Sequence, residues 1–329
     1  MKVSFTICSA NYLPYAKSLG DSFIKYNSDH LFIIILLDKG SQYYNSFAAP
    51  HTIINVEDIK LEFFEEMNER YDIFELSCAL KSFVADYIFR TFSHCELLFY
   101  FDADILVFNS LKKAETFLSD HSILITPHLA TLNNFDNRID IEKMIIRAGV
   151  FNAGFFGLKR GEETQCFLDW WMRKMRFYCY NDFPTALFVD QIWLNFVPVL
   201  FKNSVVLNDL GYNAAYWNMG ERKLISKEGQ YFINEAIPLA FFHFSGHDFK
   251  NQFLLSKYFP KYTFEYLPEC KALFQDYKNR VVENRLEYFS EIKPFYGTHT
   301  PFTLRSQSKT REKNFFKRKY KKWFKNKQD

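Results

Sequence analysis

Asp102 and Asp104 stand one residue apart, directly after an apolar run at residues 97–101. The run has the length of a buried strand, and side chains two residues apart on extended chain project to the same side. The two carboxylates can therefore face one ligand together. Bare carboxylates held close together repel each other, and either a cation or a shared proton relieves the repulsion; we expect a divalent cation that carries a diphosphate. The alternative is that both acids cap a helix that starts near Ser110.

Two distant polar residues could join this acid pair. His243 lies near the end of a predicted closing strand, residues 239–244. A strand-end histidine is usually a packed core residue, but parallel strands deliver their carboxyl ends to one edge of a sheet, so we expect His243 near the aspartates. Lys81 lies on a predicted amphipathic helix at residues 76–88, away from the centre of its apolar stripe. A solvated lysine and a substrate contact fit that position equally well.

Small and polar residues interrupt two further segments. In residues 149–157, a predicted strand, Asn152 and its small neighbours stand among bulky side chains. Glycine weakens a strand unless something approaches its backbone closely, so we expect either a ligand or a β-bulge there. A predicted helix that opens at residues 183–184 carries Asp190 and Gln191, two polar residues followed by an apolar run.

The elements that must position these residues follow an α/β order. A strand at residues 3–8, a helix at 12–26 and a buried strand at 31–37 are the opening of a nucleotide-binding sheet, whose ligand lies outside the carboxyl ends of the strands. The sequence has no GxGxxG turn that could hold the phosphates. We therefore expect a metal at the acid pair to take that role. We predict a mixed, mostly parallel sheet flanked by helices. The further expected elements are strands at residues 105–108, 123–126 and 205–207 and helices at 111–118 and 161–178.

Length and composition allow one catalytic domain with a small extension. The chain has 329 residues, of which 48% are hydrophobic, enough for a sizeable core. We place the domain at residues 1–255, a helical extension at 256–305 and a tail at 306–329. The polar stretch 127–140 is long enough to be a lid or an acceptor-binding loop.

Cysteine usage and hydropathy predict a cytoplasmic protein. The six cysteines have no CxxC pair and no metal-ligand spacing, so we expect them to be reduced core residues. No segment approaches the roughly 20 apolar residues that span a bilayer. The N-terminal sequence also lacks the tripartite form of a secretion signal.

The positive charge is concentrated at the C-terminus. Residues 301–329 hold 11 Lys or Arg against two acidic residues, a balance of +9, whereas the whole chain has a net charge of +3. Basic residues surround one aromatic face of a helical pattern there, which favours a helix lying on an anionic membrane surface. Nucleic-acid binding, which we do not expect, and a disordered solubilising tail are the alternatives. The aromatic residues are Phe316, Tyr320, Trp323 and Phe324.

Six short motifs occur in one order along residues 1–250: SANYLPYAKSL, DAD, FNAGFFG, VDQIWLN, GYNAAYWN and HFSG. Together they resemble a bacterial glycosyltransferase of the GT-A fold, similar to glycosyltransferase family 8. The resemblance implies transfer of a hexose from a nucleoside diphosphate sugar, usually a UDP-sugar, to lipopolysaccharide, capsule or another surface or lipid-linked glycan. It also implies Mn²⁺ or Mg²⁺ as the cofactor and a location at the inner face of the cytoplasmic membrane.

The same resemblance implies roles for individual residues. The metal ligands would be Asp102, Asp104 and His243, and the catalytic residues would be Asn152, Asp190 and Gln191. The remaining donor-binding residues would be Ser9, Ala10, Asn11, Tyr12, Lys81, Ala103, Ala153, Gly246 and Lys250.

Two departures from the family pattern bear on the donor site. The first loop has Ser9 and Ala10 where the family commonly has an acid, which makes a uracil base less certain. Gly246 is not followed by the family's Lys-Pro-Trp run, so the cation that meets the leaving phosphate is either Lys250 or His247.

These residue types suit a reaction at an anomeric carbon. Breaking its bond to phosphate creates an oxocarbenium-like centre and a diphosphate leaving group, and both need charge stabilisation. Gln191 cannot act as a base, so the resemblance implies retention, with the leaving phosphate taking the acceptor's proton. If Asp190 deprotonates the acceptor, the product is inverted. The rival classes are a haloacid-dehalogenase-type phosphatase with Asp102 as nucleophile and a non-catalytic, membrane-associated protein of the same fold.

Overall fold

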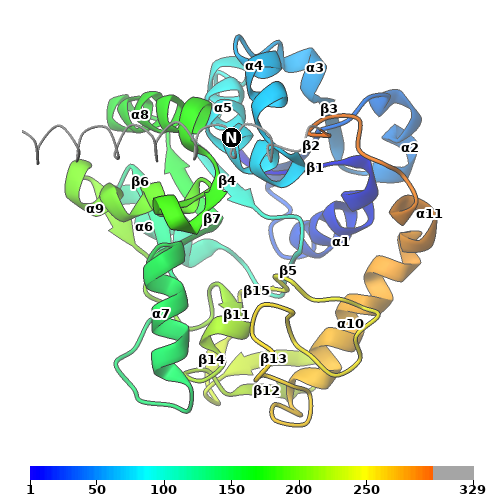
Figure 1. Ribbon diagram of the computed structural model, residues 1–329, viewed down its shortest axis with the longest axis vertical. Helices are drawn as coiled ribbons and strands as arrows, with labels where there is room; N and C mark the ends of the chain where they lie inside the picture. The colour runs from blue at the N-terminus through cyan, green and yellow to red at the C-terminus, as the bar shows by residue number, and fades with distance from the viewer. Residues whose placement is uncertain (299–329) are drawn as a thin grey trace, which may run out of the picture.

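A seven-stranded sheet lies at the centre of the protein (Figure 1). The computed structural model describes residues 1–298. The strand order is β10 (Ser204–Val206), β6 (Ile123–Pro127), β7 (Phe151–Lys159), β4 (Leu97–Phe101), β1 (Lys2–Cys8), β2 (His30–Leu36) and β3 (Thr52–Asn55). β7 runs antiparallel to β4 and β6, and the other pairs are parallel. The mixed, mostly parallel sheet is therefore confirmed.

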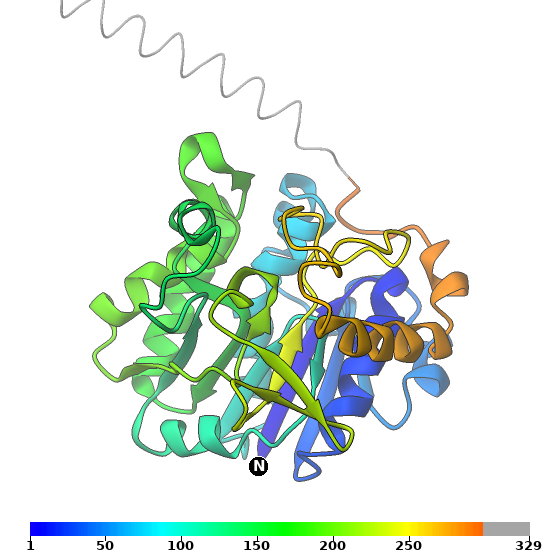
Figure 2. The same ribbon diagram turned by 90° about the horizontal axis from the view of Figure 1, so that it is seen from below.

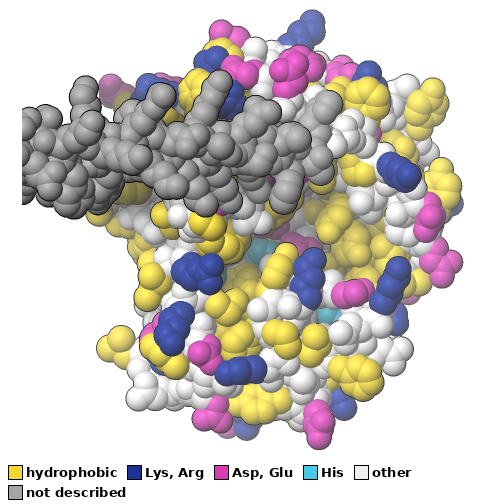
Figure 3. Space-filling model, viewed as in Figure 1, with side chains coloured by type: hydrophobic (Ala, Val, Ile, Leu, Met, Phe, Trp, Pro, Cys, Tyr) yellow, Lys and Arg dark blue, Asp and Glu magenta, His cyan; other side chains and the backbone are white. Residues whose placement is uncertain are grey.

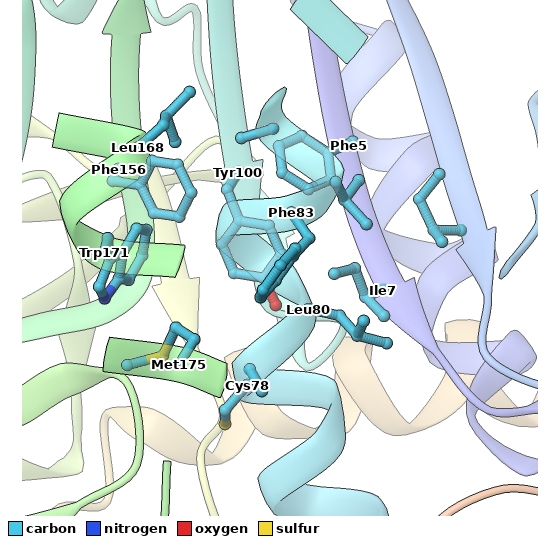
Figure 4. Packing of buried hydrophobic residues seen from close by; sticks show 14 of the residues in the cluster. Phe5, Ile7, Cys78, Leu80, Phe83, Tyr100, Phe156, Leu168, Trp171 and Met175 are labelled. Atoms are coloured by element: carbon cyan, nitrogen blue, oxygen red, sulfur yellow. The ribbon is translucent and has the colours of Figure 1, made fainter. Parts of the chain in front are cut away.

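Helices cover both faces of this sheet. The helices of residues 1–298 are α1 (Leu13–Ile24), α2 (Asn45–Ala48), α3 (Val56–Ile59), α4 (Phe64–Arg70), α5 (Ile73–Thr91), α6 (Lys112–Asp120), α7 (Arg138–Ala148), α8 (Glu162–Tyr178), α9 (Val197–Leu200), α10 (Cys270–Glu283) and α11 (Leu286–Ser290). Of these, α7 and α10 pack in a third core with the smaller sheets. On β2, Ile33 packs on the face covered by α5 and α8, and Ile34 on the face covered by α1 and α6. Because every second side chain faces the same way, a strand that is apolar throughout fills both cores. Figure 4 shows the first core, where Tyr100, Phe156 and Trp171 lie together.

α5 carries a charged residue into the first core. The helix begins at a capping box, in which the Asp72 side chain accepts from the Glu75 backbone N–H at 2.8 Å and the Glu75 side chain accepts from the Asp72 N–H. Most of its residues are buried against the sheet and α8. Lys81, which the sequence places at the edge of the apolar stripe, is therefore enclosed and only 3% exposed.

A small second sheet positions His243. It contains β11 (Ala214–Ala215), β15 (Phe241–His243) and β5 (Ile105–Val107), in that order. β15 is antiparallel to β5, with His243 opposite Ile105. The expectation that His243 ends a strand parallel to its neighbours holds for β11, with Ala215 opposite His243, and was wrong for β5. The antiparallel register still brings the histidine beside the acid pair, because Ile105 directly follows Asp104.

Two other sequence-based expectations need correction. α6 begins at Lys112 without a side-chain cap, so Asp102 and Asp104 do not cap it. The helix predicted from residue 183 is instead a 3-10 turn at 183–185, a short strand and a 3-10 segment at 191–196. The backbone φ is positive at Ala186 and Val189, which a continuous helix does not allow.

The polar connection after β6 is held in place by one buried carboxylate. The loop spans residues 128–137, because α7 begins at Arg138. Glu221 accepts hydrogen bonds from the backbone N–H groups of Ala130 and Thr131 at 2.9 Å each. The role of this loop as a lid or acceptor-binding loop stays a prediction.

The C-terminal helices pack against the rest of the fold. α10 and α11 both contact α1, and the segment between β15 and α10 lies beside α10 (Figures 1 and 2). Two minor sheets complete the described chain: β12 (Leu224–Lys227), β13 (Gln230–Ile233) and β14 (Ile237–Pro238) in one, and β8 (Asn181–Asp182) and β9 (Leu187–Phe188) in the other.

Three further expectations concern cysteines, membrane spans and the tail. Five cysteines are buried, as predicted, but Cys166 on α8 is exposed. Among residues 1–298, no helix combines the length and the apolar character needed to cross a bilayer. The basic aromatic tail at 306–329 lies outside the described residues.

Candidate active site

Two carboxylates and one imidazole converge where β4 ends. The possible ligand atoms of Asp102, Asp104 and His243 all lie within 4.8 Å of one another. His243 Nε2 is 3.0 Å from Asp104 Oδ1 and 3.8 Å from Asp102 Oδ2. His243 is buried and the two acids are partly exposed, with Ala103 buried between them. Carboxylate oxygens with one imidazole nitrogen are a donor set that suits Mn²⁺ or Mg²⁺.

Because Gly154 has no side chain, the His243 ring can occupy the space beside it. A Cβ atom at this position would lie 2.5 Å from His243 Cε1, closer than atoms can pack. Opposite it, the register between β6 and β7 shifts, so that Ile125 pairs with Phe156 and Thr126 with Asn152. The pairing of this segment is therefore irregular, and the His243 ring approaches its glycine, while the approach of a ligand stays a prediction.

Lys81 connects the acid pair to Asp190. Its Nζ lies 3.1 Å from Asp102 Oδ1 and 3.0 Å from Asp190 Oδ2, and it donates to the Ala153 carbonyl at 3.1 Å. Burial would lower the pKa of Lys81, but the two carboxylates hold this pKa well above its usual value. The solvated-lysine alternative is therefore wrong, and Lys81 is a buried cation between two acids.

Tyr100 fixes one oxygen of Asp102. Both residues project to the same side of β4, and the Tyr100 hydroxyl donates to Asp102 Oδ1 at 2.6 Å. Burial raises the pKa of Tyr100 well above its usual value, so the hydroxyl keeps its proton. Burial also opposes ionisation of Asp102, but the charges of Lys81 and His243 outweigh it and lower the pKa of this carboxyl. Asp102 is accordingly a carboxylate with a fixed orientation.

Asn152, Asp190 and Gln191 meet on the other side of Lys81. Gln191 Oε1 accepts from Asn152 Nδ2 at 2.9 Å and from the Ala153 N–H at 3.2 Å. Its Nε2 donates to the Ala148 carbonyl at 3.1 Å, so the amide is held at both ends. Burial raises the pKa of Asp190, although the charge of Lys81 acts to lower it.

A cavity of about 390 Å³ is lined by seven of the fifteen predicted site residues. Figure 3 shows histidine and acidic side chains at the base of a hollow in this face of the protein. The predicted residues that line the cavity are Lys81, Asp102, Asn152, Ala153, Asp190, Gln191 and His243. Sequence reasoning did not identify His128, Trp217 or Tyr258, which line it as well. Trp217 stands within the GYNAAYWN motif, and this was a signal that could have found it.

The first loop lies near the acid pair but outside the cavity lining. The Ser9 hydroxyl donates to Asn11 Oδ1 at 2.5 Å, and the Ala10 N–H donates to Asp38 Oδ2 at 3.2 Å. Tyr12 is 47% exposed. Burial of its hydroxyl end and then the charge of Asp104 raise the pKa of Tyr12.

Neither candidate for the phosphate-binding cation lines the cavity. Lys250 is exposed. His247 points its Nδ1 at the Leu255 carbonyl, 3.1 Å away, and its ring packs 4.7 Å from the Phe274 ring. Gly246 stands outside the lining too, under the ring of Tyr258.

A second acid and imidazole group lies at the opposite end of the strands. Asp29, His30 and Glu115 also bring possible ligand atoms within 4.8 Å of one another. The Lys2 ammonium lies 2.7 Å from Asp29 Oδ2 and 2.6 Å from Glu115 Oε2. Because a lysine already neutralises these acids, this group is an ion-pair cluster rather than a metal site.

Two proteins of Bacillus subtilis (strain 168) are similar to this chain in sequence. The uncharacterized protein YfnF is 23% identical over 245 residues, which cover 74% of this chain and 80% of YfnF. The uncharacterized protein YfnD is 29% identical over 158 residues, which cover 47% of this chain and 46% of YfnD. No family model matches the chain.

Two solved structures share the fold. The crystal structure of the galactosyltransferase LgtC in complex with donor and acceptor sugar analogs aligns with a TM-score of 0.50 and 13% identity, over 86% of this chain and 96% of that chain. The apo structure of the bifunctional glycosyltransferase WbbM aligns with a TM-score of 0.51 and 13% identity, over 89% of this chain and 52% of that chain. The chain therefore has the GT-A fold of these proteins, an α/β fold with C-terminal helices.

Proposed function

We propose that this chain is a metal-dependent glycosyltransferase that moves a hexose from a nucleoside diphosphate sugar to a glycan acceptor. The observation that carries the proposal is the convergence of Asp102, Asp104 and His243 beside the 390 Å³ cavity. The shared fold supports it, because LgtC is a galactosyltransferase solved with donor and acceptor sugar analogs. A divalent cation bound by these three residues would neutralise the diphosphate as it leaves.

The residues present fit such an ion. The imidazole Nε2 faces both carboxylates, and Gly154 has no side chain that would displace the ring. Tyr100 and Lys81 both bind Asp102 Oδ1, and Oδ2 is the oxygen that faces the imidazole. Such contacts behind a ligand orient it before the metal arrives.

Lys81, Asn152 and Asp190 would hold the transferred sugar. Asp190 is 1% exposed and paired with Lys81, so its carboxylate is oriented toward the cavity that both residues line. The amide of Asn152 is fixed by Gln191. Buried, oriented polar groups of this kind bind hydroxyl groups with little reorganisation.

We propose a retaining reaction, in which the leaving phosphate accepts the acceptor's proton. Two features support it: Gln191 has no basic group, and Asp190 Oδ2 is held in an ion pair by Lys81 at 3.0 Å. Proton NMR of the first-formed product decides this point. Retention keeps the anomeric coupling of the donor, and inversion of that coupling would make Asp190 the general base.

The finer assignments rest on the family resemblance. We propose UDP as the nucleotide, lipopolysaccharide, capsule or another lipid-linked surface glycan as the acceptor, and the inner face of the cytoplasmic membrane as the location. The same resemblance assigns Ser9, Ala10, Asn11 and Tyr12 to the nucleoside and Ala153, Gly246 and Lys250 to the donor. The C-terminal tail would contact anionic lipid.

The alternatives have less support. A phosphatase with Asp102 as nucleophile has no support from the comparisons, since both solved structures that share the fold are glycosyltransferases. A non-catalytic protein of the same fold would need no cluster of potential metal ligands, yet Asp102, Asp104 and His243 are all present and lie together.

Hydrolysis of nucleotide sugars tests the proposal. The protein is incubated with a panel of UDP-, GDP- and ADP-sugars and Mn²⁺, and release of the nucleoside diphosphate is measured with the Asp104→Ala variant in parallel. We expect one donor to be hydrolysed by the wild type and not by the variant. Release of inorganic phosphate from phosphomonoesters without sugar transfer would favour the phosphatase.

A further inference from the structure

A second hollow, separate from the candidate active site, lies between α10 and the segment that follows β15. It has a volume of about 530 Å³ and shares no lining residue with the first cavity. Figures 1 and 2 both show the segment lying beside α10. We call it the α10 hollow and define it by its lining residues His247, Phe249, Asn251, Gln252, Phe264, Lys271, Ala272, Phe274, Gln275 and Lys278.

One face of α10 supplies two basic groups to this hollow. Lys271, Phe274, Gln275 and Lys278 are spaced at i, i+3, i+4 and i+7, which places them on a single helical face. Neither lysine lies within ion-pair distance of a carboxylate belonging to residues 1–298. Seven residues of helix separate them by about 10 Å along the axis. Two uncompensated charges at that spacing suit an elongated anion better than a single small one.

Three amides add polar groups to this hollow, Asn251 and Gln252 from the loop and Gln275 from α10. Asn251 Oδ1 accepts from two backbone N–H groups of its own loop and Gln275 Nε2 donates to Asn279, so Asn251 Nδ2, Gln275 Oε1 and the amide of Gln252 are the groups that could meet a ligand. His247 donates from Nδ1 to the Leu255 carbonyl, so its Nε2 is left as an acceptor. Ligand sites combine apolar walls with a few such polar groups, and amides that can both donate and accept are well suited to saccharides.

The aromatic floor disfavours a single-stranded nucleic acid. Phe274 is 4% exposed, and the rings of His247 and Phe264 meet it edge-on at 4.7 and 5.1 Å. Phe249 is stacked on Tyr15 with parallel rings 6.0 Å apart. Bases bind single-stranded sites by stacking on open ring faces, and these rings already pack against one another.

We propose that the α10 hollow binds an acidic segment of a glycan, a saccharide with carboxylate or phosphate groups about 10 Å apart. Tyr15, on which Phe249 stacks, lies 5.0 Å from Tyr12 of the first loop, so the hollow is close to the candidate donor site. A bound acidic segment would hold an acceptor at a distance from its reacting end. This last step rests on the proposed function, whereas binding in the hollow does not.

Calorimetry with the full-length chain tests the proposal without any catalytic readout. The probes are trigalacturonic acid, a hexose phosphate dimer, the neutral trisaccharide maltotriose and a dT oligonucleotide of equal charge. We expect an acidic saccharide to bind, and the Lys271→Gln/Lys278→Gln variant to bind it at least about tenfold more weakly, since each lysine loses a charge-assisted contact. The matched control is Lys25→Gln/Lys227→Gln, which removes two exposed lysines elsewhere and should keep the affinity.

A local readout separates the hollow from other basic parts of the chain. Amide hydrogen exchange of residues 247–252 and 270–283 should slow when the acidic saccharide is added, and not in the double variant. Equal affinity in both double variants, or no local protection, would overturn the proposal. Tighter binding of the oligonucleotide, or equal binding of maltotriose, would show that the ligand is not an acidic saccharide. Donor hydrolysis is measured in parallel, so that failure of the proposed function is seen separately.

Discussion

Replacing Lys81 by methionine removes the ammonium group that lies between two carboxylates. The side chain is 3% exposed and Asp190 is 1% exposed, so Lys81→Met leaves Asp190 buried without its partner. Breaking a buried pair in this way costs about 3–5 kcal/mol. In a domain of about 255 residues we expect the melting temperature to fall by about 6–9 °C. Thermal unfolding followed by circular dichroism measures this, at pH 7 and without metal.

The double variant Lys81→Met/Asp190→Asn provides the decisive comparison. It removes both buried charges, so it should be more stable than the sum of the two single changes predicts, with a coupling of about 1–3 kcal/mol. Lys113→Met is the control. Lys113 is exposed and forms an ion pair with Asp209, and loss of such a surface pair should change the free energy of unfolding by less than about 1 kcal/mol. An unchanged melting temperature for Lys81→Met, or strict additivity in the cycle, would refute the assignment of Lys81 as a buried bridging cation.

Two further predictions concern the glycine at the metal cluster and the ion pairs at the other end of the strands. Gly154→Ala should push the His243 ring out of place, since a Cβ would lie 2.5 Å from it, and should weaken Mn²⁺ binding about tenfold or more in calorimetry; unchanged affinity would contradict this. Burial lowers the pKa of His30, and hydrogen bonds from Lys2 and His30 outweigh burial and lower the pKa of Glu115. Both groups therefore bind protons more readily in the unfolded chain, so stability should fall as the pH drops below 6.5 and again below 4.5. Urea unfolding at pH 7, 5.5 and 4 should show a smaller acid loss below about pH 4.5 for Glu115→Gln, and an equal loss would count against these ion pairs.

The acid pair could be located from sequence because its signal is local. An apolar run of strand length followed by Asp102 and Asp104 determines by itself that both acids leave the sheet edge together. The opening strand, helix and strand were predictable for the same reason, since hydrophobic periodicity is encoded in neighbouring residues.

The surroundings of the acid pair depend on contacts between distant segments. Lys81 can be buried because Asp102 and Asp190 compensate its charge. These two acids come from other parts of the chain, and the helical periodicity of α5 carries no information about them. The direction of β15 depends on its pairing with β5, which its own hydrophobic pattern does not specify. The break at Ala186 and Val189 replaced an expected helix because tertiary packing overrides weak local propensity.

Titration of the full-length protein with Mn²⁺ in the presence of UDP tests the central claim most directly. We predict one bound Mn²⁺ per chain in calorimetry, lost in Asp104→Ala and kept in Glu115→Gln, which alters the acid and imidazole group already neutralised by Lys2. Retention of the ion by Asp104→Ala, or its loss in Glu115→Gln, would contradict the assignment of Asp102, Asp104 and His243 as the metal site.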